Sequence, residues 1–160
     1  MLTSVESFSF NGIKLVDEFT NEQEGTYLIV NEVTGRGVLG QEVFTITVSN
    51  RAGSYFSNKR VLERVLTVRI TLKGASFTDL RAKIERLNEI LNVSEPVPIV
   101  FDDEPQKTYY GILDGQPEWV EKSRIAQGTI QFLCPDPYAY GEELEAIFPS
   151  DVVTLNNNGT

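Results

Sequence analysis

Histidine is missing from this 160-residue sequence, and cysteine occurs once, as Cys134. Without histidine, the chain lacks the usual general base of serine and cysteine hydrolases and the commonest imidazole ligand of metal ions. One cysteine cannot form an internal disulfide, and no CxxC pair is present to bind a metal or carry out redox chemistry. These absences exclude whole classes of enzyme, predict no cofactor, and are consistent with folding in a reducing cytoplasm.

Basic residues are also few, with 14 against 23 acidic residues and a net charge of −9. Wrapping around a phosphate backbone requires clustered lysine and arginine, so we expect no direct binding of nucleic acid. Nowhere do eighteen apolar residues follow one another, and the N-terminus has no basic start followed by an apolar run. The sequence therefore predicts neither a signal peptide nor a membrane-spanning segment.

The hydrophobic content, 41% of the residues, allows one domain to bury roughly two thirds of its unfolded surface. Alternating and β-branched stretches dominate the first half of the chain. They predict strands at residues 27–33, 43–48 and 66–72, the last two of them half-buried. Residues 49–60 are too long for a tight turn and predict an extended hairpin tip or a flexible arm.

Two local signals give sharper predictions. Asn11-Gly12 suits the positive φ angles of a type I′ turn and predicts an N-terminal β-hairpin. Ser76 can accept a hydrogen bond from the third amide of a helix whose first turn contains Asp79, so a helix is expected over residues 76–91. Its apolar stripe must pack onto a sheet, because no second helix has a comparable pattern. The stripe consists of Leu80, Ile84, Leu87 and Leu91.

Prolines and turn residues divide the C-terminal half. Pro96 and Pro98 cannot donate backbone hydrogen bonds, which predicts that a strand at residues 97–101 lies at a sheet edge. Asp114-Gly115 predicts a turn. Further strands are expected at residues 107–113, 119–123 and 125–133.

Several groups of residues could have a catalytic or binding role, but a structural role is favoured for each of them. The adjacent carboxylates of residues 102–104 could supply an acid and base for glycoside hydrolysis or hold calcium, yet they lie in a turn without the spacing of a calcium loop. Gly35-Arg36-Gly37 is a weak match to a phosphate-binding loop. Cys134 is expected to be a buried structural thiol. The aromatic residues could form a sugar-stacking platform, but core positions are favoured; they are Tyr109, Tyr110, Trp119, Phe132, Tyr138 and Tyr140.

Taken in order, several segments resemble the N-terminal domain of the distal tail proteins of siphophages and prophages of Gram-positive bacteria. The order is specific, although no single segment is. The segments are residues 8–12 (FSFNG), 35–37 (GRG), 53–56 (GSYF), 60–64 (RVLER), 95–101 (EPVPIVF), 103–105 (DEP), 109–110 (YY), 128–130 (GTI) and 132–138 (FLCPDPY).

The resemblance implies a mainly β domain with one α-helix (α+β), of the β-sandwich-like tail-tube type, with a projecting β-hairpin. It covers residues 1–141, expected to be the ring-forming domain. Residues 142–160 are expected to be a linker and the start of a C-terminal domain that is missing here, resembling a galectin or carbohydrate-binding module. The abrupt end favours a truncated chain over a natural short form.

The resemblance also implies a function. The chain would be a non-enzymatic virion protein, made in the host cytoplasm and located at the tail tip. There it would form a homohexameric hub that links the tail tube to the host-adhesion apparatus. The partners implied are the major tail tube protein, the tape measure protein and a tail-associated lysin or tip protein, with no membrane contact.

Two alternatives remain open at this stage: a tail-tube or secretion-tube ring protein, and a carbohydrate-binding or hydrolytic tip module. The ring hypothesis places functional residues in loops and at sheet edges. Arginine forks suit bidentate pairing with carboxylates, which this chain has in excess. The candidates for the subunit interface are Arg36, Arg60, Glu63 and Arg64, and a solvated hairpin face is the competing interpretation of the same residues.

Overall fold

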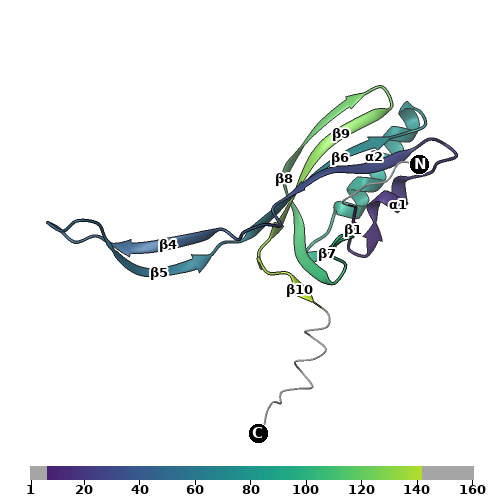
Figure 1. Ribbon diagram of the computed structural model, residues 1–160. Coiled ribbons are helices and arrows are strands. Elements are labelled where there is room, and N and C mark those ends of the chain that lie inside the picture. The colour runs from purple at the N-terminus through teal and green to yellow at the C-terminus, as the bar shows by residue number, and fades with distance from the viewer. Residues whose placement is uncertain (1–6, 142–160) are drawn as a thin grey trace, which may run out of the picture.

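Antiparallel β-strands dominate the fold of residues 7–141, the part of the chain that the computed structural model describes (Figure 1). The predicted class, mainly β with one main helix, is confirmed. The short helix α1 was not predicted, because one turn is too short to show helical periodicity. The elements are β1 (Phe8–Phe10), β2 (Ile13–Lys14), α1 (Leu15–Phe19), β3 (Tyr27–Thr34), β4 (Gln41–Ile46), β5 (Tyr55–Val61), β6 (Arg64–Lys73), α2 (Phe77–Leu91), β7 (Val97–Phe101), β8 (Lys107–Lys122), β9 (Ile125–Cys134) and β10 (Tyr140–Gly141).

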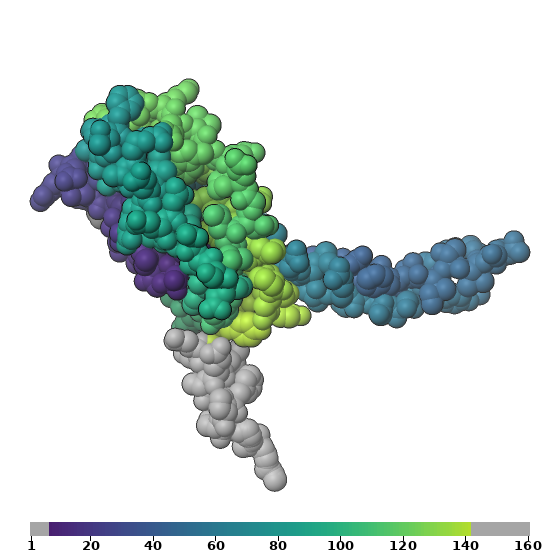
Figure 2. Space-filling view, turned by 180° about the vertical axis from the view of Figure 1, so that it is seen from behind, coloured from purple at the N-terminus to yellow at the C-terminus, as the bar shows by residue number. Residues whose placement is uncertain are grey.

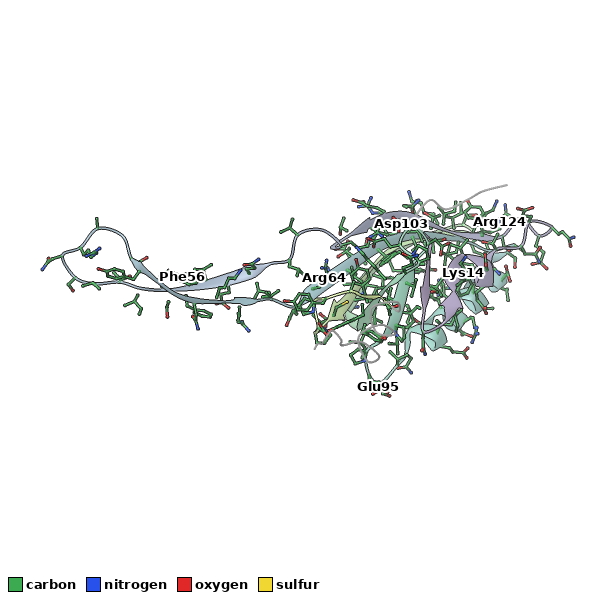
Figure 3. All side chains as sticks on the ribbon, turned by 60° about the horizontal axis from the view of Figure 1, so that its bottom comes forward. Lys14, Phe56, Arg64, Glu95, Asp103 and Arg124 are labelled. Carbon is green, nitrogen blue, oxygen red and sulfur yellow. The ribbon has the colours of Figure 1, made fainter. Side chains whose placement is uncertain are left out.

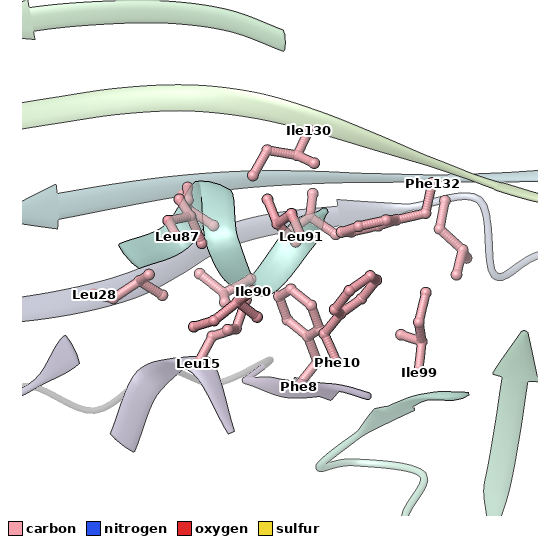
Figure 4. Packing of buried hydrophobic residues seen from close by; sticks show 14 of the residues in the cluster. Phe8, Phe10, Leu15, Leu28, Leu87, Ile90, Leu91, Ile99, Ile130 and Phe132 are labelled. Carbon is pink, nitrogen blue, oxygen red and sulfur yellow. The ribbon is translucent and has the colours of Figure 1, made fainter. Parts of the chain in front are cut away.

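The body is an antiparallel sheet with the strand order β2-β1-β7-β8-β9-β6-β3, to which β10 adds by pairing with β8. β1 and β9 are separated by two strands in this order, yet their side chains meet. The ring of Phe132 lies 6.1 Å from that of Phe8 and 5.1 Å from that of Phe10, centroid to centroid (Figure 4). The sheet therefore folds over on itself around an aromatic core, as expected of a β-sandwich-like domain.

The local turn and cap signals are confirmed. Asn11 and Gly12 have φ angles of 55° and 84°, and the strands on either side of them pair as a hairpin. At the start of α2, the Ser76 hydroxyl accepts a hydrogen bond from the Asp79 amide at 3.1 Å. The Asp79 carboxylate accepts a second one from the amide of Ala75 at 2.7 Å. Both bonds satisfy backbone donors at the helix start.

Helix α2 packs its apolar stripe onto the inner face of the folded sheet, beside Ile130 and Phe132 of β9 (Figure 4). Leu80, Leu87 and Leu91 are buried as predicted, whereas Ile84 is only partly buried at the side of the core.

The edge position predicted for the proline-flanked strand is wrong. β7 lies inside the sheet, between β1 and β8. The Pro98 carbonyl accepts a hydrogen bond from the Asn11 amide at 2.8 Å. Because the amide and carbonyl of one strand residue point to the same side, the donor that Pro98 lacks would face the turn where β1 has ended. The ladder between β7 and β8 therefore loses no bond to the proline.

The turn predicted at Asp114-Gly115 is also wrong, because β8 continues through it. Asp114 pairs with Gln131 and Glu118 with Thr129, so two extra residues bulge out of β8 between these pairs. Gly115 supplies the positive φ, 75°, that the bulge requires. The chain reverses instead after Lys122, where Ser123 has a φ of 55°.

β4 is a strand, as predicted, but it is not half-buried. Among the described residues it pairs with β5 alone, and together they form a separate two-stranded sheet that projects from the body (Figure 1). β6, by contrast, alternates buried and exposed residues as expected. The linker and the start of a C-terminal domain predicted at residues 142–160 lie outside the described residues.

The core predicts a stability test. Leu87 is 3% exposed, so Leu87→Ala should lower the free energy of unfolding by about 2 to 5 kcal/mol through lost burial and a cavity. Glu85→Ala, on the exposed side of the same helix, is the control and should leave stability within about 0.5 kcal/mol. Urea unfolding measures both, and equal midpoints for Leu87→Ala and the parent would contradict this packing.

Candidate functional site

The projecting ribbon, here called the arm (residues 41–61), is the most unusual surface of the molecule. All six residues of β4 are exposed, as are six of the seven in β5. The space-filling view shows the arm standing clear of the body (Figure 2). A two-stranded ribbon with nothing packed against it is at best marginally stable in water. Within residues 7–141, the arm finds no packing outside its own two strands.

The side chains of the arm suit a protein partner. Large apolar groups are exposed along both strands; they are Val43, Phe44, Ile46, Tyr55 and Phe56, with exposed fractions from 41% to 67%. Exposed apolar groups of this density mark interaction surfaces. The arm also contains three basic residues against one acidic, a net charge of +2, which leaves −11 on the rest of a chain whose total is −9.

Arg64, at the start of β6, holds the arm base together. Its Nε donates to the Pro137 carbonyl at 2.8 Å, and its Nη1 donates to the carbonyls of Gly35 and Gly37 at 2.5 and 3.4 Å. The guanidinium lies over the ring of Tyr109, 5.3 Å from its centroid. One side chain thus joins the loop before the arm, the strand after it and the segment that follows β9 (Figure 3).

Gly35 makes this junction possible. Its φ is 102°, a value that residues with a side chain rarely adopt. A Cβ atom at this position would lie 2.0 Å from the carbonyl oxygen of Val65. The loop can therefore approach β6 closely enough for Arg64 to reach the Gly35 carbonyl only because residue 35 is glycine.

Arg36 is paired within its own chain. Its Nη1 and Nη2 donate to the two carboxylate oxygens of Asp103 at 2.7 and 3.0 Å, and Nη1 also reaches Glu104 at 3.2 Å. The guanidinium stacks over Phe101, 4.5 Å from the ring centroid. The hydrogen bond from Arg36 lowers the pKa of Asp103, and the same bond raises the pKa of Arg36.

Tyr109 connects the two arginines. Its hydroxyl donates to Glu104 at 3.3 Å, and burial, reinforced by the nearby Glu104, raises the pKa of the phenol. The phenol therefore stays protonated and keeps this bond. Cys134, close to Arg64, is fully buried, and burial raises the pKa of its thiol to about 11. Such a thiol is inert at neutral pH, in agreement with the structural role expected for it.

The four residues predicted for the subunit interface fall into two groups. Arg36 and Arg64 meet around Tyr109 and bind their own chain. Arg60 lies on the arm, with its Nε 2.8 Å from the Glu42 carboxylate and its side chain 66% exposed. Glu63 is exposed in the two-residue link between β5 and β6. The role of these four residues at a subunit interface stays a prediction.

Sequence analysis missed Asp103, Glu104 and Tyr109 as members of this network. It treated the two carboxylates as turn residues without a partner. The core position favoured for Tyr109 is confirmed, since Tyr109 is 3% exposed. Asp102 is likewise paired, 3.3 Å from the Lys14 ammonium group. The partners are 67 and 68 residues from Arg36 along the chain, so no local pattern could have revealed the pairing.

A depression of about 530 Å³ lies on the outward face of β8 and β9 and is bordered by Arg69, Glu118 and Lys122. Across residues 7–141, no three histidine, cysteine or acidic side chains are arranged to hold a metal ion. No helix within that range is long and apolar enough to cross a membrane.

Comparisons with known proteins agree on one family. A family model described as a phage tail protein RIFT-related domain matches residues 18–134. The distal tail protein of Bacillus phage SPP1 is 32% identical over 160 residues, an alignment that covers 99% of this chain and 60% of that protein.

A crystal structure of SPP1 Dit superposes on this chain with a TM-score of 0.73 and 32% identity, over 86% of this chain and 53% of that one. SPP1 Dit is described as a paradigm of the hub adsorption apparatus in phages that infect Gram-positive bacteria. The chain thus spans little more than half the length of these relatives.

A pair of glycine variants tests the arm base. Gly35→Ala should destabilise the protein by about 1 to 3 kcal/mol from backbone strain alone, with a further cost from the clash with Val65. Gly37→Ala, where a Cβ would meet nothing within 4 Å, should change stability by less than about 1 kcal/mol. Thermal unfolding compares them, and equal losses would show that the loop adapts to a side chain at residue 35.

Proposed function

The chain belongs to the siphophage distal tail protein family, and from this membership we propose that it forms a homohexameric ring at the tail tip. The family places it among the structural proteins of the phage tail. The ring would act as a hub with no catalytic activity of its own. It would join the tail tube on one side to the host-adhesion apparatus on the other, after synthesis in the cytoplasm of the host bacterium.

The observation that carries this proposal is the arm. A ribbon that exposes its apolar residues and has no packing partner in residues 7–141 is suited to reach a neighbouring subunit. An arm that contacts a different surface of the next copy makes a head-to-tail interface. Repeated around an axis, such an interface closes into a ring.

The four predicted interface residues have different parts in this proposal. Arg60 and Glu63 are exposed on and beside the arm and would contact the neighbour directly. Arg36 and Arg64 would act indirectly, because their bonds to Asp103 and to the loop carbonyls set the direction in which the arm leaves the body.

The proposed partners of the ring are the major tail tube protein, the tape measure protein and a tail-associated lysin or tip protein. The family supports a place in the tail. No feature of the described residues favours a carbohydrate-binding or hydrolytic module over it. The arm base, built around Arg36 and Arg64 within segments that resemble distal tail proteins, favours the hub over a tube ring.

Multi-angle light scattering at high concentration tests the ring. The parent should give a mass of six chains, and Phe56→Asp, which puts a charge on an exposed apolar position of the arm, should shift the protein towards monomer. Val120→Asp, an equally exposed apolar position on the body, is the control and should leave the mass unchanged. A parent that stays monomeric when concentrated and shows no sixfold ring in images of assembled tails would overturn the proposal.

The charge of the chain predicts its behaviour towards DNA. A subunit with a net charge of −9 repels phosphate, so a ring channel should let the genome pass without holding it. A gel shift at moderate salt should show no binding of duplex DNA at micromolar protein. A retarded band at that concentration would contradict the expectation.

A further inference from the structure

A second exposed apolar surface lies on the body, on the outward face of the sheet beside the arm base. This surface, here called the apolar patch, consists of Val65, Tyr110, Ile112, Leu133 and Tyr140. Ile112 pairs with Leu133, and Leu133 pairs with Val65 across three adjacent strands, so these side chains share one face. Tyr110 is two residues before Ile112 on the same face, and its ring contacts that of Tyr140 with centroids 6.3 Å apart.

The apolar patch does not belong to the core. Phe132 and Cys134 on β9 and Leu66 on β6 alternate with the patch residues and point into the opposite, fully buried face. Val65, Tyr110 and Tyr140 keep 37% to 39% of their surface exposed. Farther along the outward face the middle of β6 and β9 is polar, with Thr67, Thr129 and Gln131, and the exposed Val120 and Ile125 lie beyond it at the far end. A polar stretch therefore separates the apolar patch at the arm end of the sheet from the apolar residues at the far end.

Acidic groups surround the apolar patch. Asp114 follows Ile112 by two residues on the same face of β8, and Glu63 precedes Val65 by two residues in the chain. Asp136 accepts hydrogen bonds from the Tyr140 hydroxyl and, at 3.1 Å, from the Tyr138 amide. No basic side chain of residues 7–141 forms an ion pair with any of these three carboxylates.

We propose that the apolar patch receives the arm of the neighbouring copy in the ring; this rests on the ring assembly proposed above. The arm complements the patch in apolar character and in charge. Its exposed Phe44, Tyr55 and Phe56 would cover the apolar residues, and its Arg51 and Lys59, which have no ion pair within the described residues, would face the carboxylates at the rim.

Dimensions and direction agree with this assignment. Adjacent strands lie about 5 Å apart, so the patch is about 10 Å wide across β6, β9 and β8. The six residues of β4 extend about 20 Å, so the arm is long enough to cross the whole width of the patch. The arm of the same chain points away from the body, with Phe56 far out on the ribbon (Figure 3). The occupant is therefore the arm of another copy. Donor and acceptor are different surfaces, as a closed ring of head-to-tail contacts requires.

Cross-linking between two variants of the 160-residue chain, each with one introduced cysteine, tests the pairing. Phe56→Cys places a thiol on the arm, and Tyr110→Cys places one on the patch. The buried native Cys134 does not compete, because its thiol is inert at neutral pH. Mixed and treated with a short bis-maleimide, the two variants should give covalent dimers on a denaturing gel. The control is Phe56→Cys mixed with Val120→Cys, because Val120 lies on the same outward face but at its far end. This mixture should give at least about tenfold less covalent dimer.

Light scattering of the parent under the same conditions separates the possible failures. If the parent forms the ring but the Tyr110 pair links no better than the Val120 pair, the apolar patch is not the receiving surface, and the ring proposal stands. If the parent forms no ring even in assembled tails, both proposals fall. As a second measurement, Tyr110→Asp should shift the parent ring towards monomer while leaving the unfolding temperature within a few degrees, and an intact ring would overturn the assignment.

Discussion

The hydrogen bonds from Arg64 to the carbonyls of Gly35, Gly37 and Pro137 are the interaction on which the shape of this molecule depends. They join both ends of the arm to the segment that leads out of β9. Because the arm has no packing of its own against the body, its direction is determined at this base. A backbone carbonyl cannot be lost by mutation, so the junction depends on one arginine and on the glycine that lets the loop approach.

The body and the arm meet opposite physical requirements. The body buries an aromatic and aliphatic core by folding its sheet over β1 and β9 and closing the inner face with α2. The arm leaves comparable apolar residues uncovered. This division concentrates the packing of the subunit in its body, and in the proposed ring the arm would gain its packing from the neighbouring copy. Ring assembly would then be coupled to stabilisation of the ribbon.

Sequence reasoning succeeded where the determinant is local. The turn at Asn11-Gly12 and the cap at Ser76 each depend on residues within one turn of the chain, and both are present. It failed where the determinant is the sheet order: the position of β7 depends on pairing with β1, almost ninety residues earlier in the chain. The network around Arg36 was not predicted for the same reason, because its charged partners become neighbours only when the sheet folds.

The uneven distribution of charge has a kinetic consequence. The arm is positive and the remainder strongly negative, so two copies that approach body to body repel each other, whereas an arm that approaches a body is attracted. In the proposed ring assembly, encounters would thereby be biased towards the head-to-tail orientation before any apolar residue is covered. Mobile ions screen such forces over about 8 Å at physiological ionic strength. Salt concentration would therefore change the rate of subunit association more than the stability of the interface once it has formed.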